Sequence, residues 1–389
     1  MTEETLPKPP DYGGRNLANL MASLSAGLGG PMPDQGPLAV LPPEAVGGHR
    51  HVVLVLVDGL GDAFLRGHPA PFLNGHRLAG IESVFPTTTA SGITTVLTGD
   101  TPATHGLTGW HVHFRELGAV LAVLPGMPRY GGVDYDQAGV DLDRLLGHHP
   151  FFDRLPVSCA QVSPAHMAHT PYNRAHTGGA RLHTFKGLQG MTDQVARLIR
   201  GGSPPRYVYA YWSELDALGH QHGPDSPERR RHLGQVDEAL AQLAQRLEGT
   251  DTLLLVTADH GMVEATHRVD LTDHPGIAHC LALPLCGEPR AAFAYVRHGW
   301  HDTFARRVRE ELGHACTLLP SHRLLERGWF GPGRRHPELE TRIGDFALVM
   351  HPGWILQDRI LGRDPHPMVG VHGGLDRREV EIPLIRVVC

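Results

Sequence analysis

The sequence predicts an α/β protein with a doubly wound central β-sheet that is flanked by helices and carries a small α/β insertion. Three runs predict the sheet because they are continuously apolar: 51–57 (HVVLVLV), 206–212 (RYVYAYW) and 251–257 (DTLLLVT). Such strands are typical of parallel sheets covered by helices on both faces. Between the second and third runs, Ser226 and Pro227 begin a helix whose leucines and valine recur at steps of three and four until Gly249 ends it.

The remaining elements divide the chain into three parts. Residues 1–49 are rich in Pro and Gly and are expected to cover the surface, with one helix at 17–28. The core is expected at 50–263 and 341–389, with further elements at 60–67, 90–98, 119–124, 157–162, 345–351 and 381–388. The small α/β insertion is expected at 264–340, with strands at 281–285, 291–297 and 316–319 and helices near 303–312 and 322–327.

The composition is that of an ordinary globular chain. With 389 residues, 41% of them hydrophobic, the chain is long enough to bury a large core. The net charge of −6 gives no reason to expect a nucleic-acid scaffold or an anionic membrane as a partner, and no apolar run has the length of a membrane span. The acidic, proline-containing N-terminus does not resemble a signal peptide, so we expect a cytoplasmic protein. Five scattered cysteines without a CxxC pair are expected to be free thiols.

Acidic residues follow each of the three apolar strands: Asp58, then Glu214 and Asp216, then Asp259 beside His260. Because ligands bind at the carboxyl ends of strands in open α/β sheets, these side chains are expected to converge. Gathered carboxylates repel one another unless cations hold them, and carboxylate, imidazole and hydroxyl groups suit zinc or manganese. Asp216 and His220 are four residues apart and would share one side of a helical turn. For any single acid, capping of the next helix is the alternative.

A hydroxyl-rich turn leads into the helix predicted at 90–98, within the stretch 85–106 (FPTTTASGITTVLTGDTPATHG). At a helix start, unpaired backbone N–H groups and the positive end of the macrodipole favour an anionic phosphate. Thr89 is therefore a candidate nucleophile. Taken alone the stretch is weak support, because Ser and Thr are also common in caps and turns for local reasons.

Five motifs, in this order, resemble those of the alkaline phosphatase superfamily: VLVDGLGD, FPTTTASGITTVLTG with TPATHGLTG, LDALGHQHGP, VTADHGM and GVHGGLD. The most similar branch is the type I phosphodiesterase/nucleotide pyrophosphatase family. The resemblance extends over most of the chain. It implies an alkaline phosphatase-like fold and a metal-dependent phosphodiesterase or nucleotide pyrophosphatase that acts through a covalent threonine intermediate.

The resemblance also implies which residues bind two divalent metal ions. The residues that match the ligands of one zinc are Asp58, Thr89, Asp259 and His260, and those that match the ligands of the other are Asp216, His220 and His372. Zinc is the expected metal, with manganese or iron as alternatives because their ligand sets overlap. Thr89, ten positions before Gly99, matches the nucleophile. The rivals are Thr87, Thr88 and Ser91, and only the spacing to Gly99 separates them from Thr89.

The implied reaction has two steps. The Thr89 oxygen attacks phosphorus in line, and water then hydrolyses the phospho-threonine, while two ions clamp the attacking and leaving oxygens. The backbone N–H of Ala90 and the side chain of Trp110 are candidate substrate contacts. Further candidate contacts, for which ordinary packing is the alternative, are His111, His113, Tyr130 and Tyr172. Glu214 is a candidate hydrogen-bond partner of a ligand. No role is given to His222, His274, His279 or His366.

Two features bear on the substrate, which is expected to be small and phosphorylated, with nucleotides among the candidates. Many nucleotide pyrophosphatases have Asn three residues after the nucleophile, where this chain has Gly92, so nucleotide specificity stays open. No Lys or Arg occurs between Arg77 and Arg115, which favours diesters over dianionic monoesters unless Arg129 or Arg174 reaches the site. The alternatives are a phosphomonoesterase or phosphonate hydrolase on the same site and, less favoured, a phosphomutase or a non-catalytic binding protein.

Overall fold

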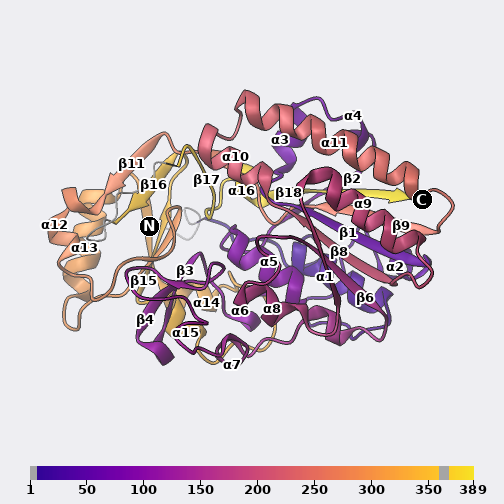
Figure 1. Ribbon diagram of the computed structural model, residues 1–389. Coiled ribbons are helices and arrows are strands. Elements are labelled where there is room, and N and C mark those ends of the chain that lie inside the picture. The colour runs from indigo at the N-terminus through magenta and orange to yellow at the C-terminus, as the bar shows by residue number, and fades with distance from the viewer. Residues whose placement is uncertain (1–6, 359–367) are drawn as a thin grey trace.

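The centre of the molecule is a mixed seven-stranded β-sheet, as seen in a computed structural model that describes residues 7–358 and 368–389 (Figure 1). In spatial order its strands are β2 (Arg77–Glu82), β18 (Glu381–Val388), β9 (Thr252–Thr257), β1 (His51–Val57), β8 (Tyr207–Trp212), β6 (Cys159–Pro164) and β7 (Arg181–Phe185). The five strands from β9 to β7 pair in parallel, whereas β18 is antiparallel to both of its neighbours. The predicted α/β fold with a central sheet is confirmed.

Helices cover both faces of this sheet (Figure 1). On one face lie α1 (Leu17–Gly27), α2 (Pro43–Gly47), α5 (Thr89–Thr98), α6 (Pro102–His105) and α8 (Pro171–Thr177). On the other lie α3 (Asp62–Gly67), α4 (Pro71–Gly75), α9 (Gly187–Arg200), α10 (Glu214–His222) and α11 (Pro227–Leu247). All seven residues of β1 are buried between these layers, which is why that run of sequence has no polar alternation.

The predicted helix after the second apolar run is α11. The Ser226 side chain accepts a hydrogen bond from the backbone N–H of Arg229, and the predicted apolar stripe is buried. The helix ends at Leu247, and Gly249 follows with a φ of +74°. Several elements of the central layers were not predicted from the sequence, namely the strands β2 and β7 and the helices α2, α4, α6, α8 and α9.

A second seven-stranded sheet lies at the end of the molecule that carries α12 (Pro275–Ala278) and α13 (His301–Leu312) (Figure 1). Its strands are, in order, β14 (Cys316–Pro320), β15 (Phe346–Met350), β13 (Ala291–Ala294), β12 (Cys286–Glu288), β3 (His111–Phe114), β4 (Ala119–Ala122) and β5 (Met127–Pro128). Successive residues of β13 alternate between two cores. Ala292 packs with the α13 side chains, and Phe293 with a cluster around Trp329 near α14 (Ser321–Glu326) and α15 (Leu339–Arg342).

This second sheet corrects two strand predictions. The strand β15, expected among the returning strands of the core, pairs instead with β13 and β14. The run 281–285 is not a strand, because Pro284 has no N–H for a ladder, and β12 begins only at Cys286. The sheet also contains strands from outside the interval 264–340, because β3 to β5 precede it and β15 follows it. The domain boundaries themselves stay a prediction.

Smaller elements complete the fold. They are the short α7 (Leu142–Leu146), the ladder of β10 (Val263–Glu264) with β17 (Gly370–Val371), the ladder of β11 (His267–Asp270) with β16 (Trp354–Gln357), and α16 (Arg377–Val380). The five cysteines are free thiols, as predicted. Among the helices of residues 7–358 and 368–389, none combines the length and the apolar composition that a bilayer crossing requires.

Candidate metal and catalytic site

Neighbouring elements of the central sheet bring six predicted ligands together in two groups. Asp58 follows β1, and Asp259 and His260 follow the adjacent strand β9, so these three form one group. Asp216 and His220 lie on α10, which follows β8 on the other side of β1, and they form the second group with His372 from the loop after β17. Within each group one ligand atom per residue lies within 4.8 Å of the others.

The Asp58 group is fully buried. The His260 Nε2 atom lies 3.5 Å from Asp58 Oδ1 and 3.4 Å from Asp259 Oδ2, and neither oxygen has a hydrogen-bond partner among the described residues. The other oxygen of each carboxylate is engaged: Asp58 Oδ2 accepts a hydrogen bond from the Tyr211 hydroxyl, and Asp259 Oδ1 accepts from the backbone N–H of Gly59 at 3.1 Å. Each carboxylate therefore has one oxygen that is fixed by the protein and one that is free to bind a cation.

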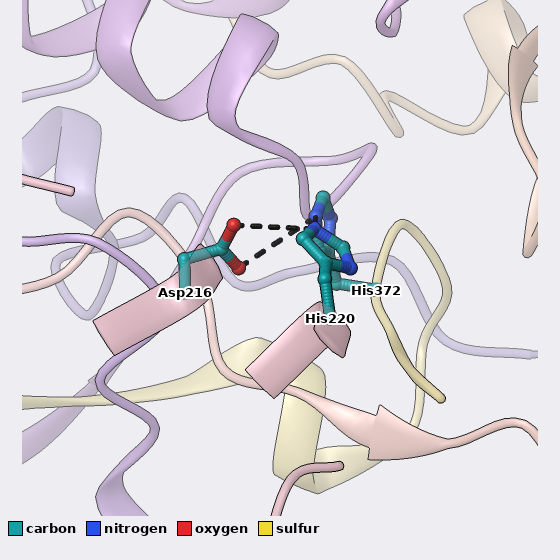
Figure 2. Close-up of side chains that lie close together, drawn as sticks. All are labelled: Asp216, His220 and His372. Atoms are coloured by element: carbon teal, nitrogen blue, oxygen red, sulfur yellow. Dashed lines mark hydrogen bonds and ion pairs between the residues drawn. The ribbon is translucent and has the colours of Figure 1, made fainter. Parts of the chain in front are cut away.

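The second group has the same organisation but is less deeply buried, because the His220 side chain is partly exposed. Figure 2 shows the Asp216 carboxylate and the imidazoles of His220 and His372 pointing toward one another. The Asp216 Oδ2 to His220 Nε2 distance is 3.1 Å, and the two Nε2 atoms are 3.3 Å apart. In the part of the chain that the structure describes, Asp216 Oδ1 has no hydrogen-bond partner. The side chain of His220 is 27% exposed, whereas that of His260 is 0% exposed.

Backbone carbonyls fix all three imidazoles in one orientation. The Nδ1–H groups of His260, His220 and His372 donate to the carbonyl oxygens of Gly261, Gly370 and Thr87 at 2.8, 2.8 and 3.1 Å. A neutral imidazole that donates through Nδ1 presents its lone pair on Nε2, which is how metal-binding histidines are usually oriented. Lone pairs of nitrogen and oxygen therefore converge in each group, and a divalent cation is the species that such a set of donors fits.

The two groups differ in their electrostatics. Burial raises the pKa of Asp58 well above its usual value, and the nearby carboxylates of Asp259 and Asp216 raise it further. Burial also raises the pKa of Asp259. In the second group burial acts in the same direction on Asp216, but His220 outweighs it, so the pKa of Asp216 is lowered. Burial disfavours the charged form of His220, yet Asp216 raises the pKa of that imidazole to about 9.

Of the four hydroxyls proposed as nucleophiles, only that of Thr89 faces the ligands. Thr89 Oγ1 lies 3.1 Å from His260 Nε2 and lines the adjacent cavity. The Thr87 hydroxyl donates to the carbonyl oxygen of Gly374, the Thr88 hydroxyl to Glu288, and the Ser91 hydroxyl to the carbonyl oxygen of Leu107. Packing thus separates residues that are neighbours in sequence.

Thr89 is the first residue of α5, whose N-terminus is not capped. The preceding Thr88 has the extended backbone of an N-cap residue, but its side chain makes no capping hydrogen bond. Within the described residues the backbone N–H groups of Thr89, Ala90 and Ser91 have no acceptor. These amides, together with the helix dipole, favour an anion beside Thr89.

Gly92 has a packing role in this structure. A Cβ atom at position 92 would lie 2.8 Å from Asp259 Cβ and 3.1 Å from Asp259 O. Any larger residue would therefore displace a ligand of the buried group. Gly92, which stands where many nucleotide pyrophosphatases have Asn, allows α5 to approach Asp259 closely.

A cavity of about 420 Å³ opens beside Thr89, Asp58 and Asp216. Its wall is formed in part by apolar side chains, among them Ile93, Leu97, Leu124, Met167 and Tyr172. Trp110, a predicted substrate contact, also lines it and is 36% exposed. No lysine or arginine is among the described lining residues.

Several predicted contacts lie elsewhere. Arg129 is paired with Asp358, and Arg174 with Asp136 at 2.7 Å, so neither arginine lines the cavity. The cavity wall also does not include His111, His113 or Tyr130. Glu214 is exposed and makes no hydrogen bond to a ligand within the described residues, which corrects that prediction. His366 lies outside the described residues.

The sequence interpretation missed two residues next to the site. The Tyr211 hydroxyl donates a hydrogen bond to Asp58. The sequence contains a pattern that could have indicated it, because Tyr207, Tyr209 and Tyr211 alternate and place three hydroxyls on one side of an otherwise apolar strand. Glu288 holds Thr88 from the second sheet, 200 residues away, and no local pattern marks it.

Comparisons with known proteins point to one family. The model of the "Type I phosphodiesterase / nucleotide pyrophosphatase" family matches residues 52–375. Human ectonucleotide pyrophosphatase/phosphodiesterase family member 5 is 25% identical over 359 residues, which is 85% of this chain and 70% of the human protein.

Solved structures share the fold. Murine ectonucleotide pyrophosphatase/phosphodiesterase 5 matches with a TM-score of 0.66 and 18% identity, over 86% of this chain and 87% of that one. Its inactive threonine-to-alanine variant in complex with AMP matches with a TM-score of 0.64, 18% identity and the same coverage. Phosphonoacetate hydrolase from Sinorhizobium meliloti 1021, in complex with phosphonoformate, matches with a TM-score of 0.59 and 20% identity, over 87% of this chain and 90% of that one.

Proposed function

The chain belongs to the type I phosphodiesterase/nucleotide pyrophosphatase family of hydrolases, and we propose that it cleaves a phosphodiester or pyrophosphate bond through a covalent Thr89 intermediate at a two-zinc site. One observation carries the proposal. The free oxygens of three carboxylates and the Nε2 atoms of three histidines form two metal-binding groups beside one cavity, and the Thr89 hydroxyl, at an uncapped helix N-terminus, lies 3.1 Å from one of those nitrogens.

The chain's own groups support each part of this chemistry. Two divalent ions, when bound, would lower the pKa of the nucleophile's hydroxyl and neutralise charge on the attacking and leaving oxygens. Asp58, Asp259, His260 and Thr89 would hold one ion, and Asp216, His220 and His372 the other. The amides of Thr89, Ala90 and Ser91 would donate to the phosphoryl oxygens, which gain charge as the Thr89 oxygen attacks.

The cavity supports a substrate whose phosphoryl group carries a second, uncharged substituent. A dianionic monoester would favour an arginine or lysine near its additional charge, and the described lining offers neither. The apolar side chains and Trp110 suit an aromatic or aliphatic group on the phosphorus. Because a murine relative has been solved with AMP, nucleotide diesters are the first natural substrates to try.

The test compares hydrolysis of bis-p-nitrophenyl phosphate and p-nitrophenyl phosphate by zinc-loaded protein at mildly alkaline pH. We expect a higher kcat/KM for the diester and a loss of about three orders of magnitude or more in Thr89→Ala, since removal of a nucleophile disables the whole unit. Undiminished turnover in Thr89→Ala would exclude the proposed intermediate. A preference for the monoester would instead favour a phosphomonoesterase on the same site.

A further inference from the structure

We propose that Glu288 is a positioning residue that keeps the N-terminus of α5 open for the phosphoryl group by holding the Thr88 hydroxyl away from it. The inference rests on the proposed function, because it assigns the open helix N-terminus to phosphoryl binding. It concerns a residue of the second sheet, whereas the six carboxylate and histidine ligands all follow strands of the central sheet or lie in the loop after β17.

Glu288 joins the second sheet to the nucleophile's helix through one oxygen. It is the last residue of β12 and is 8% exposed. Its Oε1 atom accepts a hydrogen bond from Thr88 Oγ1 at 2.5 Å and another from the backbone N–H of Trp110 at 2.6 Å. The same carboxylate therefore holds the residue before the candidate nucleophile and a residue of the cavity wall.

Without Glu288, the Thr88 hydroxyl would be expected to cap α5. A threonine with extended backbone at an N-cap position normally accepts a hydrogen bond from the backbone N–H two or three residues later. This protein contains the direct comparison: Thr170 precedes α8 with the same type of backbone, and its side chain accepts from the backbone N–H of Asn173. The Thr170 hydroxyl donates to the carbonyl oxygen of Met167, within its own turn, whereas the Thr88 hydroxyl donates to a carboxylate of a distant strand and makes no capping bond.

The consequence is that the amides at the start of α5 stay available. A Thr88 cap would occupy the backbone N–H of Ala90 or Ser91, which are two of the three amides without an acceptor in the described part of the chain. A phosphoryl oxygen beside Thr89 would then lose a donor that is most valuable as charge develops. The geometry thus assigns Glu288 an effect on catalysis that acts through Thr88.

Glu288→Ala and Glu288→Gln separate this role from simple packing. Loss of the acceptor in Glu288→Ala should lower kcat/KM for bis-p-nitrophenyl phosphate by about a hundredfold, the lower end of the range for loss of one transition-state donor. The amide oxygen of Glu288→Gln still accepts from Thr88, so that variant should stay within about threefold of the parent. If Glu288→Ala does not fold, Glu288→Leu removes the acceptor while it fills the volume.

The double variant Glu288→Ala/Thr88→Val gives the decisive comparison. Valine has the shape of threonine but cannot cap, so the amides of α5 should be released and most of the lost activity should return. If Glu288 only supported packing between the second sheet and α5, the second substitution would lower kcat/KM further or leave it at the value of Glu288→Ala. Activity of the double variant no higher than that of Glu288→Ala would overturn the proposal.

Binding of inorganic phosphate tests the same idea without turnover. Isothermal titration of zinc-loaded proteins should show about tenfold weaker phosphate affinity in Glu288→Ala, the effect of one lost hydrogen bond, with recovery in the double variant. Equal affinity in the parent and Glu288→Ala would refute the role of Glu288. If the parent binds phosphate but cleaves neither ester, the proposed function fails while the phosphate comparison still decides the role of Glu288.

Discussion

The two groups of ligands contain the same kinds of side chain but balance their charges differently. In the Asp58 group, burial raises the pKa of both carboxylates, Asp259 raises that of Asp58 further, and each keeps an oxygen without a hydrogen-bond partner among the described residues. In the Asp216 group, the carboxylate lies 3.1 Å from a partly exposed histidine whose pKa it raises. The Asp58 group therefore depends on a cation for charge compensation, whereas in the Asp216 group His220 compensates the charge of the carboxylate.

The difference follows from the elements that supply the ligands. Asp58 and Asp259 come directly after adjacent strands inside the central sheet, where the surrounding backbone excludes water. Asp216 and His220 lie one turn apart on α10, and the loop after β17 brings His372 to them. The strand ends therefore hold two carboxylates together away from water, whereas α10 places a histidine one turn from its carboxylate.

Replacing one carboxylate in each group should have the largest effect, and it tests whether the charges of the two groups are balanced differently. Asp259→Asn and Asp216→Asn each remove an anionic ligand, and we expect each to lower kcat by about three orders of magnitude, as for other members of a catalytic unit. In metal-free protein the effects on stability should be opposite. Asp259→Asn removes a buried charge beside Asp58, whereas Asp216→Asn breaks the pair with His220.

Thermal unfolding in EDTA measures this second effect. We expect the free energy of unfolding to rise by about 1 to 3 kcal/mol in Asp259→Asn and to fall by a similar amount in Asp216→Asn. Glu214→Gln, an exposed acid on the same helix as Asp216, is the matched control and should change neither activity nor stability. Shifts of the same sign in the two ligand variants would contradict the comparison.

Tyr211→Phe should have an intermediate effect, confined to the buried group. Loss of the hydroxyl that holds Asp58 should weaken zinc binding by about tenfold to a hundredfold, the usual effect of removing a group that orients a metal ligand. Competition with a chromogenic chelator measures this affinity. Tyr209→Phe is the control, because the Tyr209 hydroxyl is buried on the same strand without a hydrogen-bond partner. Equal losses in both variants would mean that Tyr211 does not orient Asp58.

The pH dependence sharpens the comparison and should be the smallest effect. In metal-free protein, His220 contributes stability that is complete below its unfolded pKa of about 6.5 and is lost as the pH rises through its raised pKa of about 9. Zinc must displace that proton, so its apparent affinity should rise with pH by about tenfold per unit for each proton displaced.

Melting temperatures with and without zinc test both statements. Between pH 6.5 and 9 the metal-free protein should lose stability while the increment added by zinc grows. Asp216→Asn should flatten the metal-free curve because the group that raises the pKa of His220 is gone. If the rise in melting temperature caused by zinc did not depend on pH, no proton would be displaced from the ligands.

Much of the fold and of the candidate site could be predicted because the signals are local. The uninterrupted apolar run of β1 requires burial on both faces, and the acid that follows it must then emerge at the edge of the sheet. The i, i+4 spacing of Asp216 and His220 places them together on α10 whatever the rest of the chain does.

The sequence by itself determined most of the strands, the order of the motifs and the candidate ligand residues, since backbone preference and hydrophobic pattern act over a few neighbouring residues. Only the tertiary structure decided which of three consecutive threonines faces the ligands, that Arg129 and Arg174 are paired elsewhere, and that β15 joins the second sheet. It also brought Glu288 to Thr88 across 200 residues. These outcomes depend on packing between distant segments, and no local pattern encodes which distant partner a side chain will meet.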